Sequence, residues 1–210
     1  TLSVWLVKAG VERSTITLFS WAGFAYSFKF LWTPIVDHCN LPVLYRMGHR
    51  RSWLLLSQLM IIISIFITSL TDPSKNLLYT AMGIVLIAFS SATQDIVIDA
   101  FRIESGTIKK QGVLSSMYLA GYRIAMIISG AGSLWLASYF GAETYDVDTW
   151  RKVYQIMGCL MLVGIFATLI SKEPSIKKSK TSSQVKFLLV LILAIIIFFF
   201  CYNFLPEIFF

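Results

Sequence analysis

Apolar runs of about twenty residues constrain the fold of this chain more than any other feature. A helix rises 1.5 Å per residue, so a run of this length crosses a hydrocarbon layer about 30 Å thick. Within hydrocarbon, only helices and closed barrels satisfy their own backbone hydrogen bonds, and these runs lack the alternation of barrel strands. The sequence therefore predicts an all-α membrane protein with six complete transmembrane helices. The predicted spans cover residues 14–36, 53–70, 77–100, 112–139, 153–170 and 187–205.

The composition supports a membrane protein and excludes an ordinary soluble domain. Of the 210 residues, 57% are hydrophobic and only 14% are charged, whereas soluble domains carry about a quarter charged residues. The three cysteines, Cys39, Cys159 and Cys201, are too scattered for a disulfide framework or a zinc site. The sequence shows no phosphate-binding loop, nucleophile–base set or HExxH pattern. We therefore expect neither an enzyme nor a protein that holds a metal or a cofactor.

The segments outside the six spans indicate how the chain is organised. Residues 1–9 are apolar but too short to cross a bilayer, and they are typical of the end of an earlier helix. They lack the charged region and cleavage site of a signal peptide. Residues 172–186 are rich in lysine and serine, and this composition predicts a flexible linker. A last, truncated hydrophobic segment follows at 187–210.

Basic residues predict the orientation of the chain in the membrane. Arg46, Arg50, Arg51, Arg102, Lys109, Lys110, Lys172, Lys177, Lys178, Lys180 and Lys186 fall on one side when the loops are counted alternately. The positive-inside rule assigns that side to the cytoplasm. The net charge of +7 is then mainly a topology signal, because the basic residues lie in short loops between spans. It gives little support for a nucleic-acid partner.

Ionisable residues inside the spans are the candidates for function. Counted from the loops, Lys29 and Asp95 lie about 10 Å from the cytoplasmic face and Arg123 lies about 18 Å in. Asp99 follows Asp95 by four residues and shares its helix face, and Gln94 precedes Asp95. Such groups are costly in hydrocarbon, and they usually face a water-filled cavity or one another.

Two interpretations remain open for these residues. Asp95 with Lys29 could be a structural ion pair that joins two spans, and Asp99 with Arg102 could be an ordinary pair at a helix end. Asp95 could instead take up and release protons, as a proton-coupled carrier requires. Arg123 has no carboxylate nearby in the sequence at its own depth, and a guanidinium there suits an anionic ligand.

The fourth span also carries a small residue at every fourth position. These residues are Gly121, Ala125, Ser129, Ser133 and Ala137. Stripes of this kind let membrane helices pack closely. Tight helix packing is therefore the expected role.

The loop between the first two complete spans links the chain to a known family. It opens with KFLWTPIVD, which ends at Asp37, and closes with GHRRSW, which contains Gly48, Arg50 and Arg51. An acidic residue at the end of one span, followed by Gly-x-Arg-Arg at the start of the next, resembles the loop between helices two and three of the major facilitator superfamily. The resemblance implies that these four residues latch helix ends at a cytoplasmic gate. The spacing is longer than the usual motif, as in one branch of the superfamily.

That branch is the AmpG-type muropeptide permeases, with acetyl-coenzyme A transporters as more distant relatives. The resemblance covers roughly residues 1–171 and includes residues 17–37, the GHRRSWLLLSQ stretch, the SATQDIVIDAFRIE stretch and the Gly121-Tyr122-Arg123 centre of the following helix. It implies an inner-membrane carrier that imports anhydro-muropeptides with protons. The implied proton-coupling residues are Asp95 and Asp99, and the implied substrate-binding residues are Arg123, Lys29, Gln94 and Tyr122.

The resemblance also implies a division into domains. Residues 1–171 are expected to form the N-terminal half of a facilitator with only a stub of its first helix, residues 172–186 the linker, and residues 187–210 the first helix of a second half. Helices eight to twelve have no counterpart in the sequence, so transport would require a C-terminal half, in the same or a separate chain. The alternatives are a non-transporting remnant or membrane interaction protein, and a carrier of another anion such as acetyl-coenzyme A.

Overall fold

The computed structural model describes residues 1–41, 47–141 and 145–174, and this part of the chain is a bundle of helices. Its α-helices are α1 (Leu2–Lys8), α2 (Arg13–Leu18), α3 (Phe24–Ser27), α4 (Thr33–His38), α5 (His49–Ser69), α6 (Leu77–Glu104), α7 (Gln111–Ile127), α8 (Ser133–Tyr139) and α9 (Val147–Ile170). Three 3-10 segments, Phe19–Gly23, Lys29–Leu31 and Ile108–Lys110, and a π-helical turn, Ile128–Gly132, join them.

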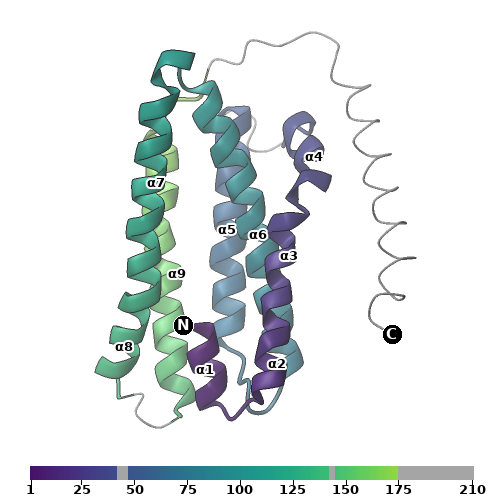
Figure 1. The fold of residues 1–210 in the computed structure, drawn as a ribbon, viewed down its shortest axis with the longest axis vertical. Coiled ribbons are helices and arrows are strands. Elements are labelled where there is room, and N and C mark those ends of the chain that lie inside the picture. The colour runs from purple at the N-terminus through teal and green to yellow at the C-terminus, as the bar shows by residue number, and fades with distance from the viewer. Residues whose placement is uncertain (42–46, 142–144, 175–210) are drawn as a thin grey trace, which may run out of the picture.

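Four helical stretches in the described residues are long and apolar enough to cross a membrane. They are His49–Ser69, Leu77–Glu104, Ile108–Tyr139 and Val147–Ile170. They run side by side along the long axis of the molecule (Figure 1). The all-α membrane fold predicted from the sequence is confirmed, and four of its six predicted spans correspond to these helices. The sixth predicted span and almost all of the predicted linker lie outside the described residues.

The predicted span at 14–36 is divided into short helical segments. α2, α3 and α4 alternate with 3-10 turns, and together they form a column beside α6 (Figure 1). Pro34 lies in the first turn of α4, and proline has no N–H to donate to the preceding turn. One helix therefore ends before α4 and another begins.

The predicted boundaries also move at several helix ends. α9 begins at Val147, six residues before the apolar run, because the side chain of Asp146 accepts hydrogen bonds from the backbone N–H groups of Asp148 and Thr149. The apolar run marks the hydrocarbon layer, whereas the capping residue marks where the helix begins.

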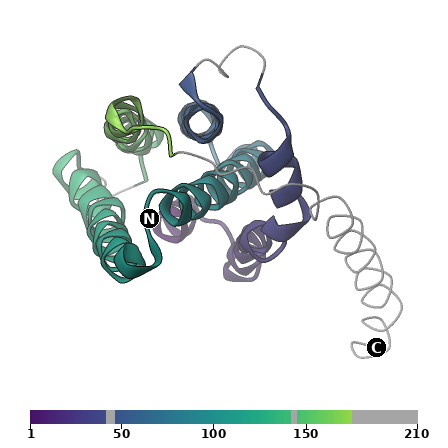
Figure 2. The ribbon, with the colours of Figure 1, turned by 90° about the horizontal axis from the view of Figure 1, so that it is seen from above.

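Small residues bring α5 close to both of its neighbours. A Cβ on Gly83 of α6 would lie 2.2 Å from Thr68 Oγ1, and one on Gly158 of α9 would lie 3.1 Å from the ring of Phe66. Glycine at these two places lets the helices approach backbone to backbone. Gln58 of α5 and Thr168 of α9 add a buried hydrogen bond of 2.9 Å. Seen from above, α7 and α9 lie to one side of α6, and residues 13–38 lie to the other (Figure 2).

Two apolar clusters hold opposite ends of the bundle. Val36, Leu54, Ile96 and Val97 join α4, α5 and α6, and Trp5, Ala137, Trp150 and Val153 join α1, α8 and α9. The stripe of small residues is buried only at one end, where Ala137 joins the second cluster and Ser133 is buried beside it, while Gly121 has open space beside it. The predicted tight packing therefore holds at that end and is absent at Gly121 among the described residues.

Candidate functional site

Lys29 and Asp95 meet inside the bundle. Lys29 Nζ lies 2.5 Å from Asp95 Oδ2 and 3.7 Å from Asp99 Oδ2, and all three side chains are partly exposed. The 3-10 turn at Lys29–Leu31 carries the lysine, and α6 carries both carboxylates one turn apart. The ion pair between Lys29 and Asp95, one of the two interpretations of these residues, is therefore present.

Two residues outside the predicted site complete this network. The Tyr118 hydroxyl of α7 donates a hydrogen bond of 2.9 Å to Asp95 Oδ1. Arg102 of α6 lies 3.3 Å from Asp99 Oδ1, donates to Ser115 Oγ at 2.6 Å and has its guanidinium carbon 5.3 Å from the centre of the Tyr118 ring. Tyr118 lies seven residues after the start of α7, at about the same distance from the loops as Lys29 and Asp95. Counting depth from the loops therefore groups Tyr118 with this pair. That signal could have found it.

The network borders a groove between α6 and α7. This groove has a volume of about 570 Å³ and is lined by side chains from α3, α5, α6, α7 and α9. Its polar residues are Tyr26, Ser91, Gln94, Asp95, Tyr118 and Tyr122. The structure thus brings Gln94, Asp95 and Tyr122 of the predicted site to one surface. Lys29 and Asp99 are joined to it through the ion pairs of Lys29.

Arg123 does not line this groove, contrary to the expectation that it faces a cavity. It is exposed on α7 and forms no hydrogen bond or ion pair within residues 1–41, 47–141 and 145–174. Successive residues on an α-helix are about 100° apart, so Arg123 and Tyr122 point in different directions. The groove lies on the Tyr122 side.

The predicted gate residues form a compact cluster at the end of the bundle that the basic loops predict to be cytoplasmic. Arg50 is only 8% exposed, and its guanidinium lies 2.6 Å from Asp37 Oδ1 and 2.6 Å from Glu104 Oε1. These contacts join α4, α5 and α6. A buried cation needs such partners because an unpaired charge is costly to bury. Glu104 was not predicted as part of the gate.

Glu173, also missed from the sequence, closes the cluster from the end of α9. Its carboxylate accepts hydrogen bonds from the backbone N–H of Arg50 at 2.8 Å and of Arg51 at 3.1 Å. In return, Arg51 donates to the carbonyls of Thr168 at 3.1 Å and Leu169 at 2.6 Å. Each helix therefore caps the other, since the first N–H groups and the last C=O groups of a helix lack partners of their own.

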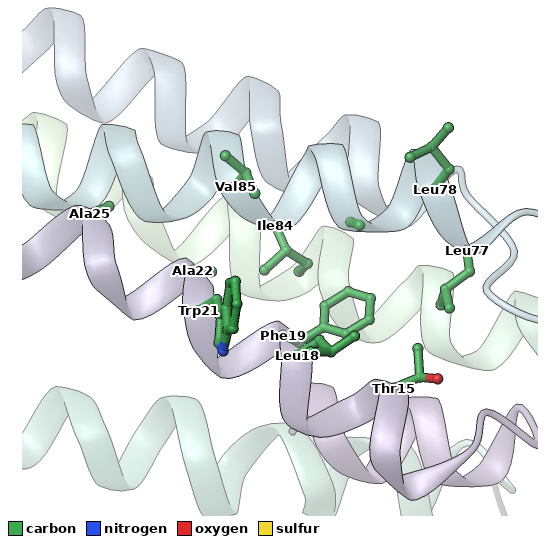
Figure 3. A pocket seen from close by; sticks show the side chains of 11 residues that line it. Thr15, Leu18, Phe19, Trp21, Ala22, Ala25, Leu77, Leu78, Ile84 and Val85 are labelled. Carbon is green, nitrogen blue, oxygen red and sulfur yellow. The ribbon is translucent and has the colours of Figure 1, made fainter. Parts of the chain in front are cut away.

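A second pocket, of about 520 Å³, lies towards the other end of α6. Its labelled side chains come from residues 15–25 on one side and from α6 on the other (Figure 3). Thr15 is the one polar residue among those that line it. Besides the Thr15 hydroxyl and the indole N–H of Trp21, this lining offers only apolar side chains to a polar solute.

The described residues contain no group of three His, Cys, Asp or Glu side chains able to hold a metal ion. Cys39 and Cys159 are free thiols, and Cys201 lies outside the described residues. For a metal ion, the described residues therefore offer no candidate ligand set of this kind.

The sequence profile of the Major Facilitator Superfamily matches residues 9–210. The chain belongs to this superfamily. Members of this superfamily are membrane carriers of solutes, and the described helical bundle fits the N-terminal part of such a protein.

Similar proteins refine this placement. The chain is 35% identical to the anhydromuropeptide permease of Escherichia coli K12 over 175 residues, which are 83% of this chain and 34% of the permease. It is 33% identical to the putative transporter AmpG 4 of Rickettsia felis over 182 residues, 87% of this chain and 42% of that protein. It is 35% identical to the putative transporter AmpG 3 of Rickettsia prowazekii over 186 residues, 88% of this chain and 42% of that protein.

These relatives confirm the resemblance to AmpG-type permeases that the four sequence stretches indicated. The chain spans about a third to two fifths of the length of the curated relatives that it matches. The described bundle accordingly corresponds to the N-terminal part of a facilitator.

Proposed function

We propose that this chain is the N-terminal part of a proton-coupled carrier that imports anhydro-muropeptides across a bacterial inner membrane. Support comes from its similarity to an anhydromuropeptide permease over 83% of its length. A facilitator encloses its solute between two halves, so the activity requires a C-terminal half supplied by the same chain or by a separate one.

The observation that carries the proton coupling is the Lys29–Asp95 pair beside the groove. Lys29, Arg102, Asp95 and Asp99 contribute two positive and two negative charges, so the network is neutral overall. One added proton leaves the network with one excess positive charge. Inside a membrane protein the effective dielectric is lower than in water, so this excess charge attracts an anion more strongly. An anionic muropeptide that enters with the proton restores neutrality. In this proposal Asp95 takes up the proton, and Asp99 is a second carboxylate that pairs with Lys29.

The remaining predicted residues receive roles consistent with their positions. Gln94 and Tyr122 contact the solute from the groove, and Lys29 attracts its carboxylate when Asp95 is protonated. Arg123, which is exposed on α7, is proposed to bind the solute once the second half covers that face. Asp37, Gly48, Arg50 and Arg51 hold the cytoplasmic gate.

The test is uptake of labelled anhydro-muropeptide into membrane vesicles by this chain, alone and co-expressed with the missing half. We expect accumulation only with both parts and its loss when a protonophore removes the gradient. Replacing Asp95 by Asn should abolish accumulation against a gradient. The matched control is Asp148→Asn, which removes an exposed carboxylate paired with Arg151 far from the groove.

The same assay can decide against the proposal in three ways. No uptake with both parts inserted in the membrane would indicate a remnant or an interaction protein. Saturable uptake of labelled acetyl-coenzyme A without uptake of muropeptide would indicate a carrier of a different anion. Unchanged accumulation by Asp95→Asn would exclude the coupling role of this carboxylate.

A further inference from the structure

Tyr118 is the partner of Asp95 that can serve both protonation states of the carboxyl group. A carboxylate only accepts hydrogen bonds, and a lysine ammonium only donates them, so Lys29 can donate to Asp95 but cannot accept a proton that Asp95 donates. A tyrosine hydroxyl both donates and accepts. Tyr118 donates to Asp95 Oδ1 at 2.9 Å while Lys29 holds Oδ2. A proton placed on Oδ1 would therefore meet a group able to accept it in a hydrogen bond.

Tyr118 also connects Asp95 to the groove. In the described part of the chain, three hydrogen-bonded contacts join α6 to α7, made by Gln111, Ser115 and Tyr118. Gln111 and Ser115 lie in the first two turns of α7, whereas Tyr118 lies deeper and lines the groove. The Arg102 guanidinium lies over its ring. The hydroxyl proton can rotate about the C–O bond without movement of this ring.

We propose that Tyr118 is a positioning residue whose O–H points to Asp95 when Asp95 is ionised and to the solute in the groove when Asp95 is protonated. When Asp95 is ionised, the Tyr118 O–H is donated to Oδ1. When a proton from solution binds to Oδ1, Asp95 donates to the Tyr118 oxygen. The tyrosine keeps its own proton and turns it towards the groove, where it meets a carboxylate of the solute. This inference rests on the proposed uptake of a proton by Asp95.

Among the charged and titratable groups around Asp95 in the described residues, Tyr118 is best placed for this role. The neighbouring groups are Lys29 on the 3-10 turn, Asp99 and Arg102 on α6, Tyr26 on α3 and Tyr122 on α7. The hydroxyl of Tyr26 is occupied by Ser91 Oγ at 2.7 Å. α5 and α9 contribute Ile61 and Met161, which do not titrate. Tyr118 alone in this set is hydrogen-bonded to Asp95 and also lines the groove.

The first experiment is infrared difference spectroscopy of this chain in lipid nanodiscs as the pH is lowered, without any solute. We expect a carboxyl band that is absent in Asp95→Asn and, at the same midpoint, a tyrosine band that is absent in Tyr118→Phe. The tyrosine band should also disappear in Asp95→Asn. Tyr26→Phe is the matched control, because its hydroxyl lines the same groove but contacts a serine, and it should retain both bands.

The second experiment measures the affinity of the completed carrier for labelled anhydro-muropeptide at acidic and neutral pH. Tyr118→Phe should lower the affinity at acidic pH about tenfold, the usual effect of one hydrogen bond to a charged group, and leave it nearly unchanged at neutral pH. A purely structural role would lower both values together.

The possible results separate this inference from the function on which it rests. Absence of any Asp95 carboxyl band would overturn the proposed proton uptake itself. An Asp95 band without a Tyr118 band would overturn only the role of Tyr118, as would a tyrosine band that persists in Asp95→Asn. An equal loss of affinity at both pH values would do the same.

Discussion

At the scale of single residues, charge inside the bundle is balanced by specific partners. Arg50 is buried between two carboxylates, and Asp95 has a separate donor for each oxygen. Removing one partner of such a buried set costs more than the set itself contributes, because the remaining charge is left without compensation. Backbone conformation is equally specific at Gly48, which adopts a φ of +108°.

Replacing Gly48 by Ala should destabilise the protein by about 1–3 kcal/mol, through the positive φ and through contact with Glu173. An added Cβ would lie 2.4 Å from Glu173 Cδ. Thermal unfolding in detergent would measure the change. Gly112→Ala is the control, since it lies in α7 with open space around it. Equal unfolding temperatures for the two variants would contradict the requirement for glycine at position 48.

The stability of the folded chain should depend on pH in the acidic range, because Asp72 becomes protonated there. Burial by itself raises the pKa of this carboxyl, but hydrogen bonds from Tyr145 and Ser74 outweigh burial, and the pKa is lowered below its ordinary value. A lowered folded-state pKa means that the stabilisation is complete above the ordinary value and is lost as the pH falls towards the folded-state value. Burial, together with the hydrogen bond to Asp72, raises the pKa of Tyr145 to about 12.

The unfolding temperature of Tyr145→Phe should therefore lie below that of the unmodified chain at neutral pH. The difference should shrink as Asp72 becomes protonated in acid. Tyr79→Phe, an exposed tyrosine on α6, serves as the control. A difference that stays constant down to the most acidic pH would show that the Tyr145 contact does not depend on the charge of Asp72.

At the scale of elements, α5 and α9 stabilise each other where the start of α5 meets the end of α9. Glu173 supplies an acceptor to the positive end of α5, and Arg51 supplies donors to the negative end of α9. Both contacts also follow the direction of the helix dipoles. The two helices are thereby fastened at the point where the chain leaves α9.

Glu173→Ala should remove about 1–2 kcal/mol, the usual contribution of an N-cap group. It should also accelerate hydrogen exchange at the amides of Arg50 and Arg51, which mass spectrometry can follow. The neighbouring exposed Lys172 provides the control Lys172→Ala. Unchanged exchange in the first turn of α5 would mean that another group caps this helix.

At the scale of the whole molecule, the contacts define two ends with different chemistry. One end carries the ion pairs of Arg50 and the reciprocal caps, and the other carries the aromatic cluster around Trp5 and Trp150. Between them lies the groove with Asp95. Of the described basic residues, Arg50, Arg51, Arg102, Lys109, Lys110 and Lys172 lie at the first end. The positive-inside rule therefore predicts that this end faces the cytoplasm.

This orientation can be tested with the native cysteines in a Cys201→Ser background. Cys39 is exposed at the end of α4, and Cys159 lies within the α9 span. A membrane-impermeant maleimide should label Cys39 in inverted vesicles and not in right-side-out vesicles. Cys159 should remain unlabelled in both, because it lies in the hydrocarbon. Labelling of Cys39 from the outside would reverse the assigned topology.

The sequence by itself determined the class of protein, most of the spans, the expected orientation and the family. These properties depend on segment length, composition and short local motifs, which can be read without knowing the fold. Only the tertiary structure decided which charges meet. Glu173 reaches Arg50 across more than a hundred residues, and Tyr118 reaches Asp95 from another helix.

The tertiary structure also decided directions that depend on helix rotation and packing. Depth along a span could be counted, and it placed Lys29 opposite Asp95. Whether Arg123 or its neighbour Tyr122 faces the groove depends on how α7 is rotated against α6, which no local pattern specified. The division of residues 13–38 depends likewise on packing beside α6 as well as on Pro34. Local sequence sets what a helix can be, and contacts between distant segments set where its side chains point.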